Sequence, residues 1–338
     1  MTVVPMIFFT PVRIAGTGHA LPRRSLSSET WDQQLGFPRG HLEAATGVRS
    51  RFVCDGEDQI DLALAASREA ISASGVCVED LDLVLGACAV PYQLIPSTAP
   101  LVMQKLGVPE GRASGHDVNS TCLSFLTAFD LAAGKIASGQ IRTALIFSSE
   151  IASRALPWKD QPEVAALFGD GAAAAVLTRA NAARSGICAN LMRSYPAAYE
   201  ACRIGAGGTR IDFHAAPAEF AKHAYFQMDG KALFRVTRKH FPAFVQELLA
   251  AAGWGVEDVD LVVPHQASPL ALRHMVEHVG FTASRVVDIV ATHGNQIAAS
   301  IPTALDIAWR AGRIAQGSRV LFVGTSAGVS FGGLAVEI

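Results

Sequence analysis

Cys122 is set apart from the other five cysteines of the chain by its surroundings. Residues 116–121 are typical of a strand end and turn, and residues 123–129 are typical of the start of an apolar helix. A cysteine at a helix N-terminus meets unpaired N–H groups and the positive end of the helix dipole, which favour the nucleophilic thiolate. The alternative interpretation is a buried structural cysteine, which is what most free cysteines are. The residue types alone leave both interpretations open.

His265 and Asn295 are candidate partners for this thiol, although they are distant from it in sequence. His265 follows the apolar segment 259–264, and α/β sheets place their sites at the carboxyl ends of their strands. Asn295 lies in the turn 292–296, which precedes another helix. A lone histidine is more often structural than catalytic, so both assignments depend on whether the fold brings these residues to Cys122.

An internal repeat indicates how the three residues could meet. The segment VEDLDLV at residues 78–84 recurs as VEDVDLV at 256–262, and GKIASG at 134–139 recurs as GRIAQG at 312–317 with the same offset. Under this repeat, the helix after Cys122 corresponds to the helix after Asn295. A pseudo-twofold axis between the copies would bring both helix starts toward the centre of the molecule.

Each copy of the repeat predicts the same order of elements. A helix at 61–74 or 236–252 precedes a VEDxDLV strand, further helices follow, and an apolar strand at 143–147 or 319–323 closes the copy. This alternation predicts an α/β protein with mostly parallel sheets. We predict two halves of similar size, residues 1–180 and 181–338, whose boundary falls between residues 179 and 216.

The composition excludes several classes of partner and location. Lys and Arg number 28 against 30 Asp and Glu, a net charge of −2, so the chain has no basic excess for nucleic acid or anionic lipid. The cysteines show no C-x-x-C pair and no zinc-like spacing, which predicts reduced thiols in the cytoplasm. The apolar start, residues 1–11, contains two prolines and no basic cluster, so it is typical of a first strand rather than a targeting segment. The uncharged stretch 83–104 contains three prolines, which excludes a membrane helix there.

Two further motifs have better structural explanations than catalytic ones. Residues 324–328 match the G-x-S-x-G elbow of serine hydrolases, but the few residues that follow resemble a glycine-rich strand and not the helix that an elbow needs. We therefore expect a glycine-rich backbone loop. Residues 274–278 match the H-x-x-E-H form of a zinc-peptidase helix. The apolar stripe of that helix predicts that His274 and His278 lie on a solvated face, so we expect no metal site.

The sequence resembles the β-ketoacyl-acyl carrier protein synthase III family, which has the thiolase fold. The matching segments, in the family's order, lie at residues 46–49, 117–125, 168–172, 263–267, 293–295 with 298–302, and 328–332. The resemblance covers nearly the whole chain. It implies an α/β thiolase-like fold in which two pseudo-symmetric halves form five αβαβα layers, with Cys122 in the first half and His265 and Asn295 in the second.

The resemblance also implies an acyltransferase that carries out a decarboxylative Claisen condensation, as in the initiation of fatty acid biosynthesis. Cys122 would take an acyl group from a thioester, and a malonyl thioester would then lose carbon dioxide. His265 and Asn295 would donate hydrogen bonds to the enolate oxygen, and the backbone N–H groups of Cys122 and Ala327 would hold the tetrahedral oxyanion. No cofactor or metal is implied, because acyl-CoA or acyl-carrier protein and malonyl-carrier protein are the substrates.

The chain departs from the family where the family handles its acyl donor. The tryptophan and arginine of the family's adenine clamp correspond to His41 and Ala45, and Leu270 stands where the family often has an arginine for the carrier protein. Residues 119–121 and 325–328 also differ from the small residues and the Phe-Gly-Gly-Gly that the family has there. Arg235 does match a basic position for docking of the acyl carrier protein.

The resemblance further implies a homodimer, in which Leu94 and Ile95 reach the acyl pocket of the partner. Three alternatives stay open for the function. One is a pathway-specific ketosynthase III-like acyltransferase of secondary metabolism. Another is a silent subunit that pairs with an active ketosynthase. The third is a papain-type cysteine peptidase, which uses Cys, His and Asn in the same order but would not require an internal duplication.

Overall fold

Two five-stranded sheets form the framework of the protein, whose computed structural model describes residues 9–180 and 185–338. The first sheet has the strand order β2-β8-β7-β5-β6 and the second has the order β1-β9-β14-β13-β12. The strands of the first sheet are β2 (Arg13–Ala20), β5 (Leu83–Gly86), β6 (Ser114–Asp117), β7 (Thr143–Glu150) and β8 (Gly171–Thr178). Those of the second are β1 (Thr10–Pro11), β9 (Gly186–Ser194), β12 (Leu261–Pro264), β13 (Arg319–Ser326) and β14 (Ser330–Glu337). The second sheet thus takes its edge strand β1 from the N-terminal half.

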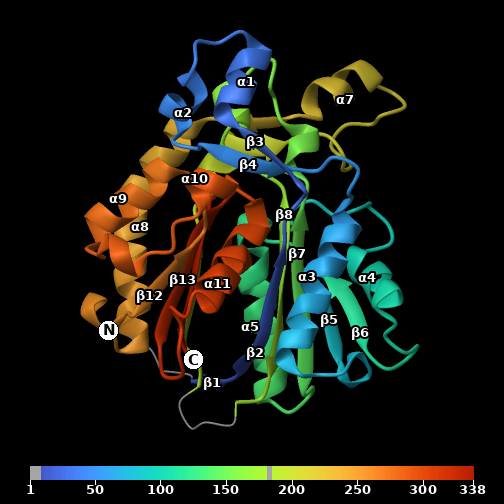
Figure 1. Ribbon diagram of the computed structural model, residues 1–338, viewed down its shortest axis with the longest axis vertical. Helices are drawn as coiled ribbons and strands as arrows, with labels where there is room; N and C mark the ends of the chain where they lie inside the picture. Colours follow the sequence, from blue (N-terminus) through green and yellow to red (C-terminus); the bar gives the residue numbers. More distant parts are fainter. Residues whose placement is uncertain (1–8, 181–184) are drawn as a thin grey trace.

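Helices cover both faces of both sheets, which gives five layers (Figure 1). The middle layer contains α5 (Ser124–Ala137) and α11 (Ser300–Arg310), whose apolar side chains share one core with strands of both sheets. The outer face of the first sheet packs against α3 (Gln59–Ser74) and α4 (Thr98–Leu106). The outer face of the second packs against α8 (Gly230–Ala252) and α9 (Pro269–Val279). The predicted five-layered αβαβα arrangement is confirmed.

The prediction of mostly parallel sheets is wrong, because both sheets are mixed. β5 pairs in parallel with β6 and β7, and β12 pairs in parallel with β13. The pairs β7–β8, β2–β8, β13–β14, β14–β9 and β1–β9 are antiparallel. A parallel pair needs a long crossover connection, whereas only a short turn separates β13 from β14.

The repeat is visible in the structure as two copies of one element order. The VED segments form single 3-10 turns at Val78–Asp80 and Val256–Asp258, and the strands begin only at Leu83 and Leu261. The predicted VEDxDLV strands are therefore shorter than expected. The helix predicted from residue 236 begins earlier, at Gly230, because the Asp229 side chain caps it by accepting the N–H of Ala232 at 2.9 Å.

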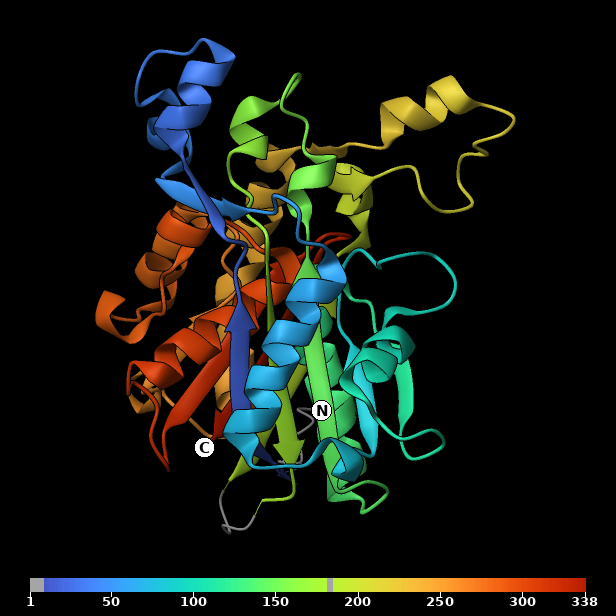
Figure 2. The same ribbon diagram turned by 45° about the vertical axis from the view of Figure 1, so that its right-hand side comes forward.

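A cap of shorter elements gathers at one end of the two sheets (Figures 1 and 2). Its helices are α1 (Ser28–Leu35), α2 (His41–Thr46), α6 (Pro162–Ala165), α7 (Pro217–His223) and α10 (Val290–His293). Its strands pair as β3 (Arg24–Ser27) with β4 (Ser50–Val53) and β10 (Cys202–Ile204) with β11 (Phe226–Met228).

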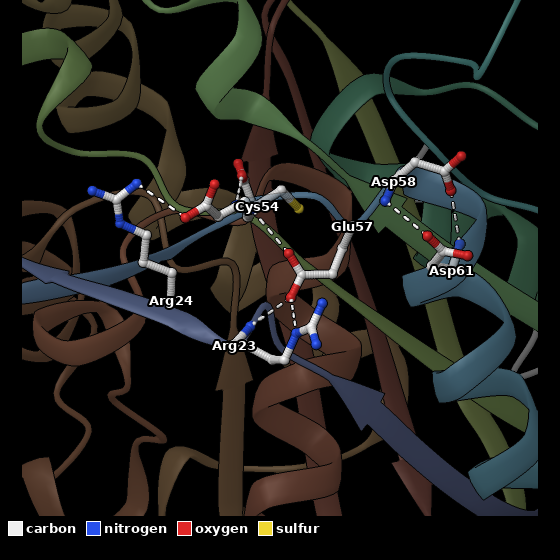
Figure 3. Close-up of polar contacts among 8 residues, drawn as sticks. Arg23, Arg24, Cys54, Glu57, Asp58 and Asp61 are labelled. Carbon is white, nitrogen blue, oxygen red and sulfur yellow. Dashed lines mark hydrogen bonds and ion pairs between the residues drawn. The ribbon is translucent and has the colours of Figure 1, made fainter.

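The connection from the cap to α3 is fixed by side-chain hydrogen bonds (Figure 3). Asp58 and Asp61 form a capping box at the start of α3. Just before it, Glu57 accepts the backbone N–H and the Nε–H of Arg23, both at 3.0 Å, and the N–H of Asp55 at 2.9 Å. These hydrogen bonds lower the pKa of Glu57 to about 2.

Two predictions touch residues that the structure does not describe. Of the predicted first strand, only Thr10–Pro11 is described as strand β1, and residues 1–8 lie outside the described range. The predicted division at residue 180 borders residues 181–184, which also lie outside it, so this division stays a prediction. Within 9–180 and 185–338, no helix is both long and apolar enough to cross a membrane.

Candidate active site

Cys122 lies in a tight turn that leads directly into α5. Residues Thr121–Leu123 form a single 3-10 turn, and Thr121 has the positive φ of 53°, which is rare for a β-branched residue. Side chains hold this turn. Asn119 Oδ1 accepts the N–H of Thr121 at 2.9 Å, and Ser124 Oγ accepts the N–H of Ser120 at 2.9 Å. The position of Cys122 at the helix start is therefore as predicted.

The second copy of the repeat builds the same turn at the start of α11. Asn295 Oδ1 accepts the N–H of Ile297 at 2.8 Å, Ile297 has a φ of 52°, and Ser300 Oγ accepts a backbone N–H at 3.0 Å. Ala298 occupies the place that Cys122 has in the first copy. Asn295 is thus the counterpart of Asn119, and the thiol is present in one copy only.

The orientation of the Asn295 amide follows from its partners. Asn295 is 6% exposed, and its Oδ1 accepts from Ile297 N–H and, at 3.5 Å, from the Ser300 hydroxyl. Nδ2 is the donor that remains, with a long contact of 3.4 Å to the Ala267 carbonyl. The backbone N–H of Asn295 donates to Leu167 O at 2.8 Å, which ties the turn to the segment before β8.

His265 directly follows β12 and is almost completely buried, with 5% of its surface exposed. Its N–H donates to Val323 O at 2.9 Å, and Nδ1 is buried without a hydrogen-bond partner. Burial lowers the pKa of His265 to about 4, so its imidazole is neutral at physiological pH. Gly324 makes room for this ring, because a Cβ at position 324 would lie 2.7 Å from the His265 Cβ.

The protonation of Cys122 differs from the sequence-based expectation. Burial raises the pKa of the Cys122 thiol to about 12, and nearby Cys202 and Glu150 add to this effect. The N–H groups of Ala327 and Cys122 itself point at the sulfur and oppose the rise, but they do not outweigh the loss of solvation. The helix start therefore supplies donors at the sulfur without producing a resting thiolate.

The terminal loop lies against the cysteine turn. It connects β13 to β14, and Ser326 Oγ donates to the Ser120 carbonyl at 2.8 Å. A strand follows the G-x-S-x-G motif, as predicted, so this serine has no elbow geometry. This hydrogen bond ties the residue before Ala327 to the turn that contains Cys122.

One cavity of about 1480 Å³ joins the predicted residues. It is lined by Cys122, His265, Asn295 and Ala327, and exposed Arg235 also borders it. Leu94 and Ile95 do not line this cavity in their own chain and are 72% and 87% exposed. The structure thus brings the three candidate catalytic residues together, while the roles of these residues stay predictions.

The positions of the family's adenine clamp lie beside this cavity. Ala45 lines it, and His41 Nε2 contacts the Glu163 carboxylate at 3.1 Å. His41 also packs against Phe37, with ring centroids 4.4 Å apart. Neither position holds the tryptophan or the arginine of the family.

Two buried residues of the region were missed or misplaced by sequence reasoning. Glu150, at the end of β7, is 1% exposed and accepts N–H groups of Ala89, Val90 and Ala298. Its place at a strand end does not predict this burial, since an acidic residue there is usually solvated. His274 was expected on a solvated face but is buried and lines the cavity, because α9 turns this side toward α8.

The described residues bring three potential metal ligands together in one place, His19, Glu69 and Asp306. The Asp306 carboxylate already accepts from Thr17 at 2.6 Å and from Arg310 at 2.7 Å, and it contacts His19 at 2.5 Å. These contacts satisfy the carboxylate, and none of the three ligands lines the cavity.

Comparisons with known proteins agree with this architecture. Family models described as 3-oxoacyl-[acyl-carrier-protein] synthase III and as its C-terminal part match residues 116–196 and 249–338. A relative named beta-ketoacyl-[acyl-carrier-protein] synthase III, from Neisseria gonorrhoeae, is 32% identical over 331 residues, which cover 96% of this chain and 98% of the relative.

Solved structures show the same similarity. The crystal structure of 3-oxoacyl-[acyl-carrier-protein] synthase III from Aquifex aeolicus has a TM-score of 0.87 and 29% identity, covering 97% of this chain and 100% of that one. The priming beta-ketosynthase from the R1128 polyketide biosynthetic pathway has a TM-score of 0.87 and 26% identity, covering 99% and 98%.

Proposed function

The chain belongs to the 3-oxoacyl-[acyl-carrier-protein] synthase III family, and from this premise we propose that it condenses a Cys122-bound acyl group with a malonyl thioester. The protein is an acyltransferase of the β-ketoacyl-acyl carrier protein synthase III type. The observation that carries the proposal is the convergence of Cys122, His265 and Asn295 on one cavity, with two backbone N–H groups at the sulfur.

Acylation of Cys122 exchanges one thioester for another. The sulfur attacks the carbonyl carbon of the donor, the bond from that carbon to the donor sulfur breaks, and the thiol proton ends on the leaving donor thiol. Because the pKa of Cys122 is about 12, the proton leaves as the new bond forms rather than beforehand. The N–H groups of Ala327 and Cys122 stabilise the oxyanion at this stage.

Decarboxylation of the malonyl thioester then depends on neutral donors. As the bond to carbon dioxide breaks, its electron pair forms an enolate whose oxygen accepts from His265 and from Asn295 Nδ2. Both are neutral and buried, and each such donor is worth about 3 kcal/mol to a developing oxyanion. The fixed Asn295 amide and the neutral His265 ring are therefore suited to this step.

Carbon–carbon bond formation completes the cycle. The enolate carbon attacks the Cys122 thioester, and the tetrahedral oxyanion accepts from the same two backbone N–H groups. Collapse of this intermediate breaks the bond from the carbonyl carbon to the Cys122 sulfur and releases the β-ketoacyl product, and the sulfur takes up one proton from solvent to restore the thiol. The order of the steps requires the first thiol to leave before the malonyl thioester reacts, so ping-pong kinetics are expected.

Partners and setting are part of the proposal. Lys231 and Arg235 border the cavity and supply positive charge for an acyl carrier protein, whereas Arg203, which also borders it, is paired with Glu200. Exposed Leu94 and Ile95 are suited to reach the acyl pocket of a second copy in a homodimer. We place the enzyme in fatty acid biosynthesis and lipid metabolism, and the free thiols of its six cysteines are compatible with the cytoplasm. The proposed condensation needs no cofactor, metal or nucleic-acid partner.

A specific observation favours a second candidate, a ketosynthase III-like acyltransferase of a secondary-metabolite pathway. His41 contacts Glu163 beside the cavity where the family has its adenine clamp, which points to an acyl donor other than a simple acyl-CoA. The similarity to the R1128 priming ketosynthase is compatible with this candidate, but the Aquifex aeolicus synthase III is as similar in fold and more similar in sequence.

The test is product formation by variants that separate the two half-reactions. The enzyme is given an acyl thioester and malonyl-carrier protein, and β-ketoacyl-carrier protein is measured by mass spectrometry. His265→Ala and Asn295→Ala should each lower condensation about 100-fold or more while Cys122 is still acylated. The exposed His214→Ala is the matched control and should behave as the unmodified protein. Condensation at an unchanged rate in both variants would overturn the proposal.

A further inference from the structure

One buried carboxyl group lies close to both of the turns that hold Cys122 and Asn295. Glu150 is the last residue of β7, is 1% exposed, and is not among the residues that line the cavity. The turn Ile297–Ala299 packs against β7 and also against the turn Thr121–Leu123. Glu150 is therefore placed behind the cavity wall, where its side chain can contact both copies of the repeat.

The contact with the second copy is direct. Glu150 accepts the backbone N–H of Ala298, the residue at the place that Cys122 has in the first copy. Ala298 directly follows Ile297, and the N–H of Ile297 is accepted by Asn295 Oδ1 at 2.8 Å. Loss of the contact at Ala298 would therefore loosen the same turn that orients the Asn295 amide.

The contact with the first copy runs through the segment that follows β5. Glu150 accepts the N–H of Ala89 at 2.5 Å, and the carbonyl of Ala89 accepts Asn119 Nδ2 at 2.9 Å. Asn119 Oδ1 in turn accepts the N–H of Thr121 at 2.9 Å. Because Thr121 directly precedes Cys122, a short series of hydrogen bonds joins Glu150 to the cysteine turn.

The side chain at this place needs two acceptor oxygens. The N–H groups of Ala89, Val90 and Ala298 all donate to the Glu150 carboxyl group, that of Val90 at the long distance of 3.5 Å. Both oxygens of a carboxyl group can accept, whereas an amide has one oxygen and an NH₂ group that only donates. Glutamine at position 150 would therefore leave at least one of these N–H groups facing another donor, which is costly in a buried place.

The repeat shows what stands at the equivalent place in the other half. The equivalent strand β13 ends at Ser326, and the Ser326 hydroxyl donates to the Ser120 carbonyl at 2.8 Å. The end of each strand thus contacts the turn of the other copy. The short serine side chain ties its strand to that one turn, whereas the longer Glu150 side chain joins the turns of both copies.

Resting on the function proposed above, we propose that Glu150 is a positioning residue that fixes the distance between the Cys122 turn and the Asn295 turn. Condensation needs the Cys122 thioester and the enolate at Asn295 within bonding distance, and a misplacement of about 1 Å can cost about 100-fold in rate. Acylation does not involve Asn295, so it depends less on this distance. Glu150 touches no substrate and exchanges no proton with it in this account.

The first experiment measures the two half-reactions separately in Glu150→Gln. Acylation is followed by the mass of the Cys122 adduct, and condensation by the discharge of this adduct with malonyl-carrier protein. We expect condensation to fall about tenfold or more and acylation to stay within about twofold of the unmodified enzyme. A merely structural role would lower both rates together, because it would act through the amount of folded enzyme.

Asp82→Asn is the matched control for this experiment. The Asp82 carboxylate accepts the N–H groups of Arg142 at 2.8 Å and of Thr143 at 3.2 Å, where β7 begins. The control therefore makes the same change from acid to amide at the opposite end of the same strand. It should leave the ratio of the two rates unchanged.

The second experiment is independent of activity and measures amide hydrogen exchange by mass spectrometry in the substrate-free protein. Glu150→Gln should speed exchange in residues 119–123 and in residues 295–299 about tenfold relative to β8, and Asp82→Asn should speed neither. Asn119→Ala removes the link to Thr121 at an exposed residue, so it should affect residues 119–123 alone. Adding Glu150→Gln to Asn119→Ala should then speed only residues 295–299.

The outcomes separate this inference from the proposed function. An unchanged ratio of the two rates, the same change of ratio in Asp82→Asn, or faster exchange in only one turn or in neither overturns the inference alone. Absence of a Cys122 adduct in the unmodified enzyme counts against the proposed function, and the exchange of the two turns then decides the inference. If Glu150→Gln does not fold, Glu150→Asp takes its place. Its shorter side chain cannot hold both turns, so unchanged rates and exchange in this variant would overturn the inference.

Discussion

Replacing Glu150 by glutamine should alter how the free energy of unfolding varies with pH more than it alters that free energy at low pH. Glu150 is buried at the end of β7, where its carboxylate accepts N–H groups of Ala89 at 2.5 Å, Val90 at 3.5 Å and Ala298. Burial outweighs these hydrogen bonds and raises its pKa from 4.5 to about 8. The folded protein therefore holds a proton that the unfolded chain has lost at neutral pH.

The sign and size follow from this difference. Between pH 4.5 and about 8 unfolding releases the Glu150 proton, so the free energy of unfolding falls as pH rises. The slope approaches about 1.4 kcal/mol per pH unit, and the total over the window is about 5 kcal/mol. Glutamine cannot ionise, so the free energy of unfolding of the variant does not decrease in this way as pH rises. Its amide NH₂ faces a backbone N–H in place of an oxygen, which costs about 1–3 kcal/mol at low pH.

The assay is urea unfolding of both proteins at several values between pH 5.5 and 8.5. Groups other than Glu150 titrate in both proteins, so the difference between the two stability curves isolates this carboxyl group. The stability of the variant relative to the unmodified protein should rise by about 3 kcal/mol between pH 5.5 and 8, and the variant should be the more stable of the two near pH 8. Parallel curves, or a gap that widens as pH rises, would refute the reasoning.

Three other substitutions test separate parts of the structure. Gly324→Ala places a Cβ 2.7 Å from the His265 Cβ, so it should displace the His265 ring. Condensation, measured by the mass of the product, should fall at least about tenfold, while the mass of the protein shows that Cys122 is still acylated. Normal condensation would contradict the close packing. Glu57→Gln should give the opposite pH effect to Glu150→Gln, because the pKa of Glu57 is lowered to about 2. The stability that the ionised carboxylate provides is present above pH 4.5 and is lost toward pH 2, so the stability of the variant should fall less steeply between these values. An identical fall in both proteins would contradict this. Ile95→Trp should shorten the acyl chains that the enzyme accepts if Ile95 lines the partner's acyl pocket, and an unchanged chain-length profile in a competition assay would remove that role.

The candidate site could be located from sequence because the repeat constrains it. Matching the two copies placed Cys122 and Asn295 at equivalent helix starts, and the structure shows the same hydrogen-bonded turn at both. His265 was found from its place at the end of an apolar strand. These positions lie at the ends of helices and strands, and the hydrophobic periodicity of the sequence predicts where those elements begin and end.

Features that depend on tertiary burial could not be predicted in this way. The pKa of Cys122 is raised because the cavity walls exclude water, which outweighs the local helix-start donors. The helical periodicity of the sequence predicted His274 on the polar side of α9, because this pattern does not show that α8 covers that side. The antiparallel pairings were missed because helix and strand alternation does not reveal how a strand returns along its sheet.

The intact mass of the protein after exposure to acyl-CoA and acyl-carrier protein thioesters tests the central claim most directly. We predict a mass increase of one acyl group that is absent in Cys122→Ala and that disappears when malonyl-carrier protein is added, with release of the β-ketoacyl product. An adduct that persists in Cys122→Ala, or one that malonyl-carrier protein does not discharge, would contradict the role of Cys122 as the acyl carrier of a ping-pong condensation.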